Sequence, residues 1–417
     1  MKDRMLPPTP RTVTGAPPRT SPGWLVDLLG RGPQAVEQWW AGVGRTPVVG
    51  PVLEHDGVDV CEVTFVAQVD PGPEQAAVEV MVHLNGLTDH HRRDITPSLM
   101  EPVPGSQLRH LTLLLPVDGT WSYRLVHGSP LDRHAGASRE GWRAVHLAGR
   151  VDPRNPRRLH DGQGADSSVW SGPGARLVDG WPDAGSRHAG MLVEREVLRD
   201  DGARRPVWVL GAGRLVLVIF DGALWRSLGI VDALAACAPL LPGGEPPSLV
   251  LVDSIDHQRR ALDLTDEARL GALLGDALDV AAPVLGGLPD PGRVVVAGQS
   301  FGGLAAALAV VHHPQLARTA IVQSGSFWYD PDRPTSPDQR GPVPGRLARQ
   351  LCDPLDLAGR RLLVQAGTDE GEMDSQALWM VERLRGLGAE ASFDHWRGGH
   401  DHAWWRHGLV FALSQLG

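Results

Sequence analysis

The sequence has few cysteines and no long apolar run. Its three cysteines, Cys61, Cys237 and Cys352, are far apart and odd in number, which excludes a disulfide framework or a zinc site and indicates free thiols in a reducing compartment. No apolar stretch reaches the roughly 18 residues that a membrane-spanning helix needs. The first 21 residues are rich in Pro, Arg and Thr and lack the apolar segment of a secretory signal. These absences predict a protein of a reducing compartment with no membrane partner.

A surplus of positive charge is also missing. The formal net charge is −9 and the pI is near 6.0, which argues against nucleic acid or an acidic membrane surface as a partner. The chain has 417 residues, of which 42% are hydrophobic. That is enough for two domains, each with a core of its own.

The first half of the chain indicates a small β-sandwich. We expect residues 1–21 to be a disordered tail and residues 22–187 to form an N-terminal domain, with a helix within 22–42. Short alternating runs separated by turn residues fill 52–126 and predict antiparallel strands at 60–66, 77–82, 111–115 and 121–125. Residues 128–187 are dense in Gly, Pro, Asp and Arg, which predicts a long irregular connector.

Residues 188–417 indicate an α/β domain. Apolar strands alternate with helical segments there, which is typical of a doubly wound, mostly parallel sheet covered on both faces. The predicted strands are 192–198, 207–210, 215–220, 249–252, 294–297, 320–323, 362–365 and 392–396.

A nucleophile elbow is predicted where the strand at 294–297 ends. The motif is Gly298-Gln299-Ser300-Phe301-Gly302, with an Ala- and Leu-rich helical pattern behind it. In such a turn Ser300 projects at the N-terminus of the helix, where the amide of Phe301 can meet developing negative charge. We expect Gly298 and Gly302 to lie where a Cβ would collide with the backbone.

A histidine and an acid follow the serine in the order that α/β-hydrolases use. Gly398-Gly399-His400-Asp401 places His400 in a loop that two glycines make flexible, and its imidazole suits proton transfer near neutral pH. The acid follows the strand at 362–365, and we favour Glu370 over the alternative Asp369. The second oxyanion donor should follow the third strand, where the amide of Ala223 is the candidate.

These motifs together resemble the iron(III) enterobactin esterase family, in the esterase D branch of the α/β-hydrolases. The resemblance covers nearly the whole chain from about residue 22. One departure is Asp263, because relatives usually carry Glu in the Arg-x-x-Glu-Leu motif that begins here at Arg260. The matching stretches are Gly86–His91, Asp152–Pro156, Arg205–Trp208, Asp221–Trp225, Val252–Asp256, Gly298–Gly303, Gln323–Trp328, Gly398–Asp401 and Trp405-Arg406.

The resemblance implies a cytoplasmic serine esterase that cuts the ester bonds of a ferric catecholate siderophore, a tri-serine macrolactone. Ser300 would be the nucleophile, His400 the base and the carboxylate after Gly367 the acid. No cofactor is expected, and the iron would arrive with the substrate. His90 and His91 are expected to belong to a hydrogen-bonded loop and not to a metal site.

An aromatic, negatively charged substrate needs aromatic faces and cations near the elbow. The candidates are Trp225, Arg260, Trp328, Trp405 and Arg406, each of which has packing or ion pairing as its alternative role. Two other functions remain open: an esterase D-type hydrolase for another aromatic or acyl ester, and a non-catalytic siderophore-binding protein. The sequence gives no indication of the oligomeric state.

Overall fold

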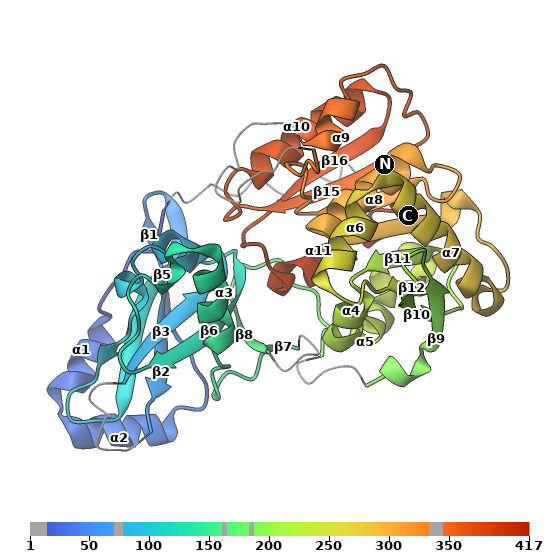
Figure 1. Cartoon of the computed structure of the whole chain (residues 1–417). Coiled ribbons are helices and arrows are strands. Elements are labelled where there is room, and N and C mark those ends of the chain that lie inside the picture. The colour runs from blue at the N-terminus through green and yellow to red at the C-terminus, as the bar shows by residue number, and fades with distance from the viewer. Residues whose placement is uncertain (1–14, 71–77, 161–164, 183–186, 333–344, 417) are drawn as a thin grey trace. The chain divides into compact units, whose positions relative to one another are not determined.

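The computed structural model describes residues 15–70, 78–160, 165–182, 187–332 and 345–416 (Figure 1). Its contacts divide these residues into two compact units. The N-terminal unit contains the residues up to Arg176 together with Arg397–Trp404, and the C-terminal unit contains Leu177–Trp396 and the residues from Trp405 onward. The chain therefore enters the N-terminal unit twice.

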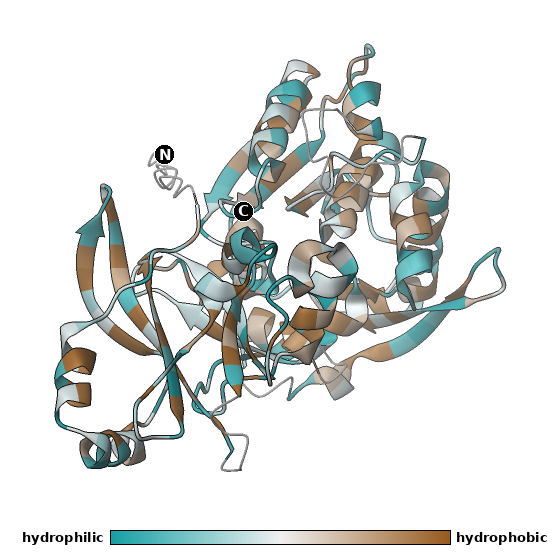
Figure 2. Ribbon diagram, turned by 60° about the vertical axis from the view of Figure 1, so that its left-hand side comes forward, coloured by the Kyte–Doolittle hydropathy of each residue, from teal (hydrophilic) through white to brown (hydrophobic). Residues whose placement is uncertain are grey.

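The N-terminal unit is a sandwich of two four-stranded antiparallel sheets, as predicted. Apolar side chains such as Phe65, Leu113 and Trp121 alternate along the strands and fill the space between the sheets. The banding of brown and teal along these strands in Figure 2 shows the same alternation. One sheet has the order β1 (Val48–His55), β2 (Val58–Gln68), β5 (Leu108–Pro116), β4 (Glu101–Pro102), and the other β3 (Glu79–Leu84), β6 (Thr120–Gly128), β8 (Ser167–Ser171), β7 (Arg158–Leu159).

Three expectations for this half of the chain are wrong in part. Residues 1–14 of the predicted tail lie outside the described residues, but Thr20 donates its amide to the carbonyl of Thr112, and Arg19 forms a bridge with Leu113, so the end of the tail follows β5. The predicted connector contains helix α3 (Arg139–Ala148) and strand β8, whose Trp170 stacks on Trp121 in the core. The predicted helix within 22–42 is two helices, α1 (Gly23–Gly30) and α2 (Pro33–Gly42).

The C-terminal unit is built on an eight-stranded sheet, and all eight predicted strands are present. The six strands from β11 to β16 run parallel, whereas β9 and β10 pair antiparallel at one edge. The sheet order is β16 (Glu390–Trp396), β15 (Arg361–Gly367), β14 (Thr319–Gln323), β13 (Val294–Gln299), β11 (Val216–Phe220), β12 (Ser248–Val252), β10 (Arg204–Leu210), β9 (Val193–Leu198).

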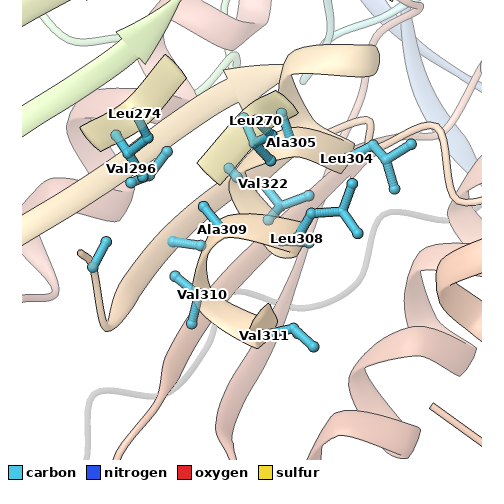
Figure 3. Packing of buried hydrophobic residues seen from close by; sticks show 14 of the residues in the cluster. Leu270, Leu274, Val296, Leu304, Ala305, Leu308, Ala309, Val310, Val311 and Val322 are labelled. Atoms are coloured by element: carbon cyan, nitrogen blue, oxygen red, sulfur yellow. The ribbon is translucent and has the colours of Figure 1, made fainter. Parts of the chain in front are cut away.

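Helices cover this sheet because its central strands, β11 to β15, are buried on both faces. Figure 3 shows Leu304 and Leu308 of α8 with Leu270 of α7 and Val296 of β13 in one continuous core. The glutamine side chains of β14 and β15 donate to backbone carbonyls of α11. The helices of the unit are α4 (Gly222–Leu228), α5 (Ile230–Ala236), α6 (His257–Thr265), α7 (Glu267–Leu285), α8 (Phe301–His312), α9 (Arg346–Gln350), α10 (Met373–Gly386) and α11 (His402–Ser414), whose first three residues belong to the N-terminal unit.

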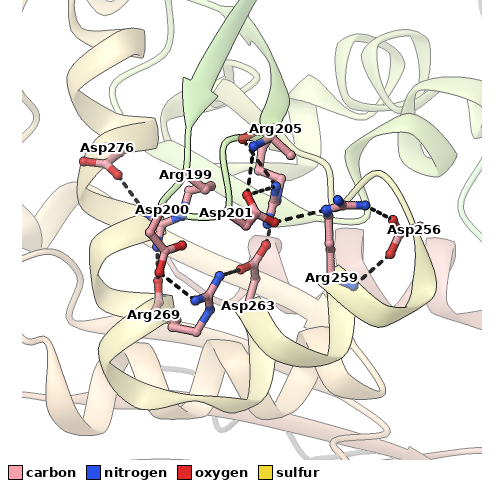
Figure 4. A network of polar contacts seen from close by, with 10 residues as sticks. Arg199, Asp200, Asp201, Arg205, Asp256, Arg259, Asp263, Arg269 and Asp276 are labelled. Carbon is pink, nitrogen blue, oxygen red and sulfur yellow. Dashed lines mark hydrogen bonds and ion pairs between the residues drawn. The ribbon is translucent and has the colours of Figure 1, made fainter.

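A network of ion pairs ties β10 and the turn before it to α6 and α7 (Figure 4). At its centre the guanidinium of Arg205 and the carboxylate of Asp263, both fully buried, are 2.7 Å apart. Asp263 also lies 3.1 Å from Arg269 of α7. The aspartate that departs from the family pattern is therefore half of a buried structural ion pair.

Candidate active site

The turn between β13 and α8 has the geometry of a nucleophile elbow. Ser300 has φ 58° and ψ −118°, a conformation that costs a residue with a side chain of the order of 1–3 kcal/mol. A Cβ on Gly298 would lie 2.3 Å from the backbone of Gly302, so that position requires glycine. The strain and the crowding hold Ser300 at the N-terminus of α8.

The crowding expected at Gly302 occurs one residue later. A Cβ on Gly302 would meet its nearest atoms at 3.5 Å, which is ordinary van der Waals contact. A Cβ on Gly303 would lie 2.9 Å from the carbonyl oxygen of Gln323, because α8 packs closely on the end of β14. The prediction that a Cβ at Gly302 would collide with the backbone is therefore wrong.

A short turn after β14 contacts both the predicted nucleophile and the predicted acid. The hydroxyl oxygens of Ser300 and Ser326 are 3.3 Å apart, and the amide of Ser326 donates to the carbonyl of Ser300. Two residues earlier, the hydroxyl of Ser324 donates to Oε1 of Glu370 at 2.6 Å. Neither serine of this turn is among the site residues predicted from the sequence.

Glu370 is the better placed of the two candidate acids. Its side chain is buried, and the hydroxyl that it accepts from is itself fixed by the indole N–H of Trp405, 2.8 Å from Ser324 Oγ. Asp369 is only half-buried and lies 3.4 Å from the hydroxyl of its neighbour Thr368. A buried carboxylate with a fixed orientation is what a triad acid requires.

A ladder of buried glutamines runs under this site at the carboxyl ends of three neighbouring strands. Gln299 Nε2 donates to Gln323 Oε1 at 2.8 Å, and Gln323 Nε2 donates to Gln365 Oε1 at 2.7 Å. The ladder is closed at its ends by the indole of Trp225 and the carbonyl of Gly408. It links the residue before Ser300 to the strand that precedes Glu370.

The predicted oxyanion donors lie at the starts of two helices. Phe301 is the first residue of α8, where amides have no acceptor within the helix. Ala223 lies in the first turn of α4, with its amide 3.5 Å from Oδ1 of Asp253, which is a weak contact. Burial raises the pKa of Asp253, and the nearby charge of Asp221 acts in the same direction.

Arg260 is engaged by an ion pair, which is the alternative role that the sequence left open, and its contact with a substrate stays a prediction. Its guanidinium makes two hydrogen bonds of 2.6 Å to the carboxylate of Asp221 and one of 3.3 Å to the carbonyl of Gln299. Burial alone would lower the pKa of Arg260, but Asp221 outweighs it and raises the pKa. Arg260 thus joins the loop before Ala223 to the strand before Ser300.

Three other predicted substrate contacts are also buried. Trp225 is fully buried with its indole on Gln299, Trp405 is bonded to Ser324, and the guanidinium of Arg406 lies 6.0 Å from the ring of Trp181. These placements support packing and positioning roles for the three side chains. Trp328 is half-buried with its ring 6.2 Å from that of Phe301, and it remains a candidate for substrate contact.

His400 lies in the segment that belongs to the N-terminal unit, whereas Ser300 and Glu370 lie in the C-terminal unit. Its side chain is exposed, and its carbonyl accepts a hydrogen bond of 3.3 Å from Nδ2 of Asn85. The glycines before it do not have positive φ. The reason for them is close packing against the N-terminal unit and not the flexibility that we predicted.

The loop with His90 and His91 is held by hydrogen bonds. Asp89 accepts from the indole of Trp142 at 2.9 Å, and Nδ1 of His91 is 2.7 Å from the hydroxyl of Ser98. Within the part of the chain that the structure describes, no group of three or more His, Cys, Asp or Glu side chains is arranged to hold a metal ion. Among the same residues no helix is long and apolar enough to cross a membrane.

The order and direction of the strands and the elbow after β13 define an α/β-hydrolase. Residues 62–181 match the family model described as "Enterochelin esterase, N-terminal", and residues 282–416 match the one described as "Putative esterase".

Known proteins match both units. The iron(III) enterobactin esterase of Dickeya dadantii is 30% identical over 96% of this chain and 97% of its own length. The iron(III) enterobactin esterase of Escherichia coli O6:H1 is 29% identical over 91% of this chain and 96% of its own length. The crystal structure of the enterobactin esterase from Shigella flexneri in the presence of enterobactin matches with a TM-score of 0.75 and 27% identity, over 91% of this chain and 97% of that one. The chain belongs to the iron(III) enterobactin esterase (enterochelin esterase) family, which confirms the resemblance seen in the sequence.

Proposed function

We propose that this protein is a serine esterase that hydrolyses the ester bonds of a ferric catecholate siderophore, an enterobactin-like trilactone. The observation that carries the proposal is the strained elbow at Ser300, with the buried carboxylate of Glu370 connected to it through the turn from Ser324 to Ser326. The substrate class comes from the relatives, whose names state that they act on iron(III) enterobactin.

In this proposal Ser300 and His400 act as nucleophile and base. His400 removes the proton from Ser300 Oγ as that oxygen attacks the ester carbonyl, and it then protonates the leaving alkoxide. The product of this half-reaction is an acyl-enzyme, which water hydrolyses with the same base. The carboxylate of Glu370 orients the imidazole and stabilises its cationic form.

The negative charge of the tetrahedral intermediate is met by backbone amides in the same proposal. Phe301 donates from the N-terminus of α8, and Ala223 donates from the loop that Arg260 and Asp221 hold in place. The contact of Ala223 with Asp253 is long enough to give way to a developing oxyanion. Each such donor contributes about 3–4 kcal/mol to the barrier reduction in serine esterases and proteases.

An esterase for another aromatic or acyl ester is the second candidate function. A cluster of free cations at the elbow was the feature expected to favour the charged siderophore. Because Arg260 is paired with Asp221 and Arg406 is buried, these two side chains do not favour one substrate over the other. The choice of a siderophore therefore depends on the relatives, and the assay must test it directly.

The test is product analysis by liquid chromatography and mass spectrometry. Wild type and Ser300→Ala are incubated with ferric enterobactin, iron-free enterobactin and a nitrophenyl ester. We expect serine–catechol fragments from the wild type only. Cleavage of the nitrophenyl ester without cleavage of either siderophore form would replace the substrate with another ester. Binding of ferric enterobactin with no turnover of any ester would instead indicate a carrier protein.

A further inference from the structure

The loop that carries His400 folds as part of the N-terminal unit, although the elements on both sides of it belong to the C-terminal unit. Residues Arg397–Trp404 follow β16 and include the first three residues of α11, whose remaining residues belong to the C-terminal unit (Figure 1). The amide of Thr120, the first residue of β6, donates to the carbonyl of Arg397 at 3.1 Å. The guanidinium of Arg397 is 2.5 Å from the carboxylate of Asp118. The loop therefore begins on the sandwich.

Asp401, the residue after His400, is anchored by two backbone amides. Its Oδ2 accepts from the amide of Ser122 in β6 at 2.5 Å, and its Oδ1 accepts from the amide of Ala403 at 3.0 Å. The side chain is buried, as is Ser122. A carboxylate that accepts two backbone N–H groups makes charge-assisted hydrogen bonds, which are about twice as strong as neutral ones. One bond fixes the start of α11, and the other fixes the loop to the sandwich.

The two glycines allow the loop to approach the sandwich closely. A Cβ on Gly399 would lie 2.7 Å from the carbonyl oxygen of Asn85 and 2.9 Å from Cα of Gly86. A Cβ on Gly398 would lie 2.5 Å from the indole of Trp404 and 3.0 Å from the carbonyl oxygen of Thr120. Asn85 also donates to the carbonyl of His400. The stretch Gly86–His91, one of those that match the family, thus begins where the histidine loop is held.

We propose that the N-terminal unit fixes the backbone of the catalytic histidine, with Asp401 as the main positioning residue and Asn85 as the second. The inference rests on the proposed function, in which His400 is the base. It gives the sandwich a role in the chemical step for every ester, and not only in the binding of a siderophore. A misplacement of about 1 Å in a catalytic group costs on the order of a hundredfold in rate.

The test compares Asp401→Ala and Asp401→Asn with the control Asp94→Ala. Asp94 also accepts a backbone amide within the N-terminal unit, that of Thr96, but it is exposed and far from the loop in sequence. Each variant is assayed with a small nitrophenyl ester and with ferric enterobactin. We expect Asp401→Ala to lower kcat for both substrates by a similar factor of about 10 to 100, with KM little changed. Asp401→Asn keeps an acceptor oxygen and should recover part of the loss, while Asp94→Ala stays near wild type.

A loss confined to ferric enterobactin, or one that appears in KM alone, would overturn the inference and make the sandwich a substrate-binding wall. Because Asp401 is buried, thermal unfolding is recorded on the same samples, and Gly399→Ala provides a second variant that displaces the loop without removing a charge. If Gly399→Ala is folded and fully active on the small ester, the inference fails. Wild type that hydrolyses the small ester but not the siderophore would contradict the siderophore proposal alone. The role of the N-terminal unit is tested separately, by the variants on the small ester.

Discussion

At the scale of single residues, the structure distinguishes two neighbouring acids by their surroundings. Glu370 is buried and held by Ser324 and Trp405, whereas Asp369 is half-buried beside Thr368. We expect Glu370→Gln to lower kcat on a nitrophenyl ester by about 10²- to 10⁴-fold, because a neutral amide cannot stabilise the imidazolium. Asp369→Asn, measured in the same assay, should cost less than tenfold. The assignment is wrong if Asp369→Asn is the more damaging change.

The site residues that could be predicted from the sequence belong to local motifs, whereas those that could not are defined by contacts between distant segments. Ser300 was predictable because the elbow is a local pattern of strand, glycine, serine and helix. The roles of Ser324 and Ser326 were not, because they arise from hydrogen bonds between segments 46 and 26 residues apart. Trp225 and Trp405 lie next to the predicted catalytic loops in sequence, but their rings are buried inside the unit. The spacing of residues in the sequence does not determine the direction of such side chains.

At the scale of elements, removal of one partner of the buried ion pair between β10 and α6 should be strongly destabilising. Arg205 and Asp263 are both fully buried. Asp263→Ala leaves an arginine without its buried partner, and we expect a loss of about 3–5 kcal/mol in the free energy of unfolding. The control is Glu196→Ala, which breaks the exposed pair with Arg204 and should cost at most about 1 kcal/mol. Urea titration of both variants checks this; equal losses would show that burial of the Arg205 pair is unimportant.

Elements were predictable from sequence where burial alone determines their composition. The parallel strands β11 to β15 are almost entirely buried and appear as apolar runs, so composition alone was enough to predict them. Strands β9 and β16 were also predicted, although they are partly exposed. Strand β8 was missed because its five residues are mostly polar and lie in a Gly- and Pro-rich stretch. It is a strand because Trp170 stacks on Trp121 and because β8 pairs with the edge of β6 opposite β3. Both contacts are tertiary, so the local sequence does not indicate them.

At the scale of the whole molecule, stability should depend on pH through His83 of β3. Burial lowers the pKa of His83 to about 3, with contributions from the charges of His146 and Arg124. Because an unfolded histidine has a pKa near 6.5, the unfolded chain binds the proton first as the pH falls. This contribution is complete above pH 6.5 and is lost progressively between about pH 6.5 and 3.

The corresponding variant is His83→Phe, which keeps a ring against Trp142 and His146. Between pH 7 and pH 5 we expect the variant to lose about 2 kcal/mol less stability than wild type, as measured by urea unfolding. The exposed His55→Phe serves as the control and should follow the wild type. Parallel curves for His83→Phe and wild type would contradict the prediction.

The discontinuous N-terminal unit has a consequence for synthesis on the ribosome. The sandwich is not complete at Arg176, because it also includes Arg397–Trp404, which are made roughly 220 residues later. At about 5–20 residues per second this delay lasts roughly ten seconds to most of a minute. During that time the first residues of β6, including the amide of Ser122, lack the loop that they bind in the finished protein. The N-terminal unit is thus begun first on the ribosome but can be completed only near the end of translation.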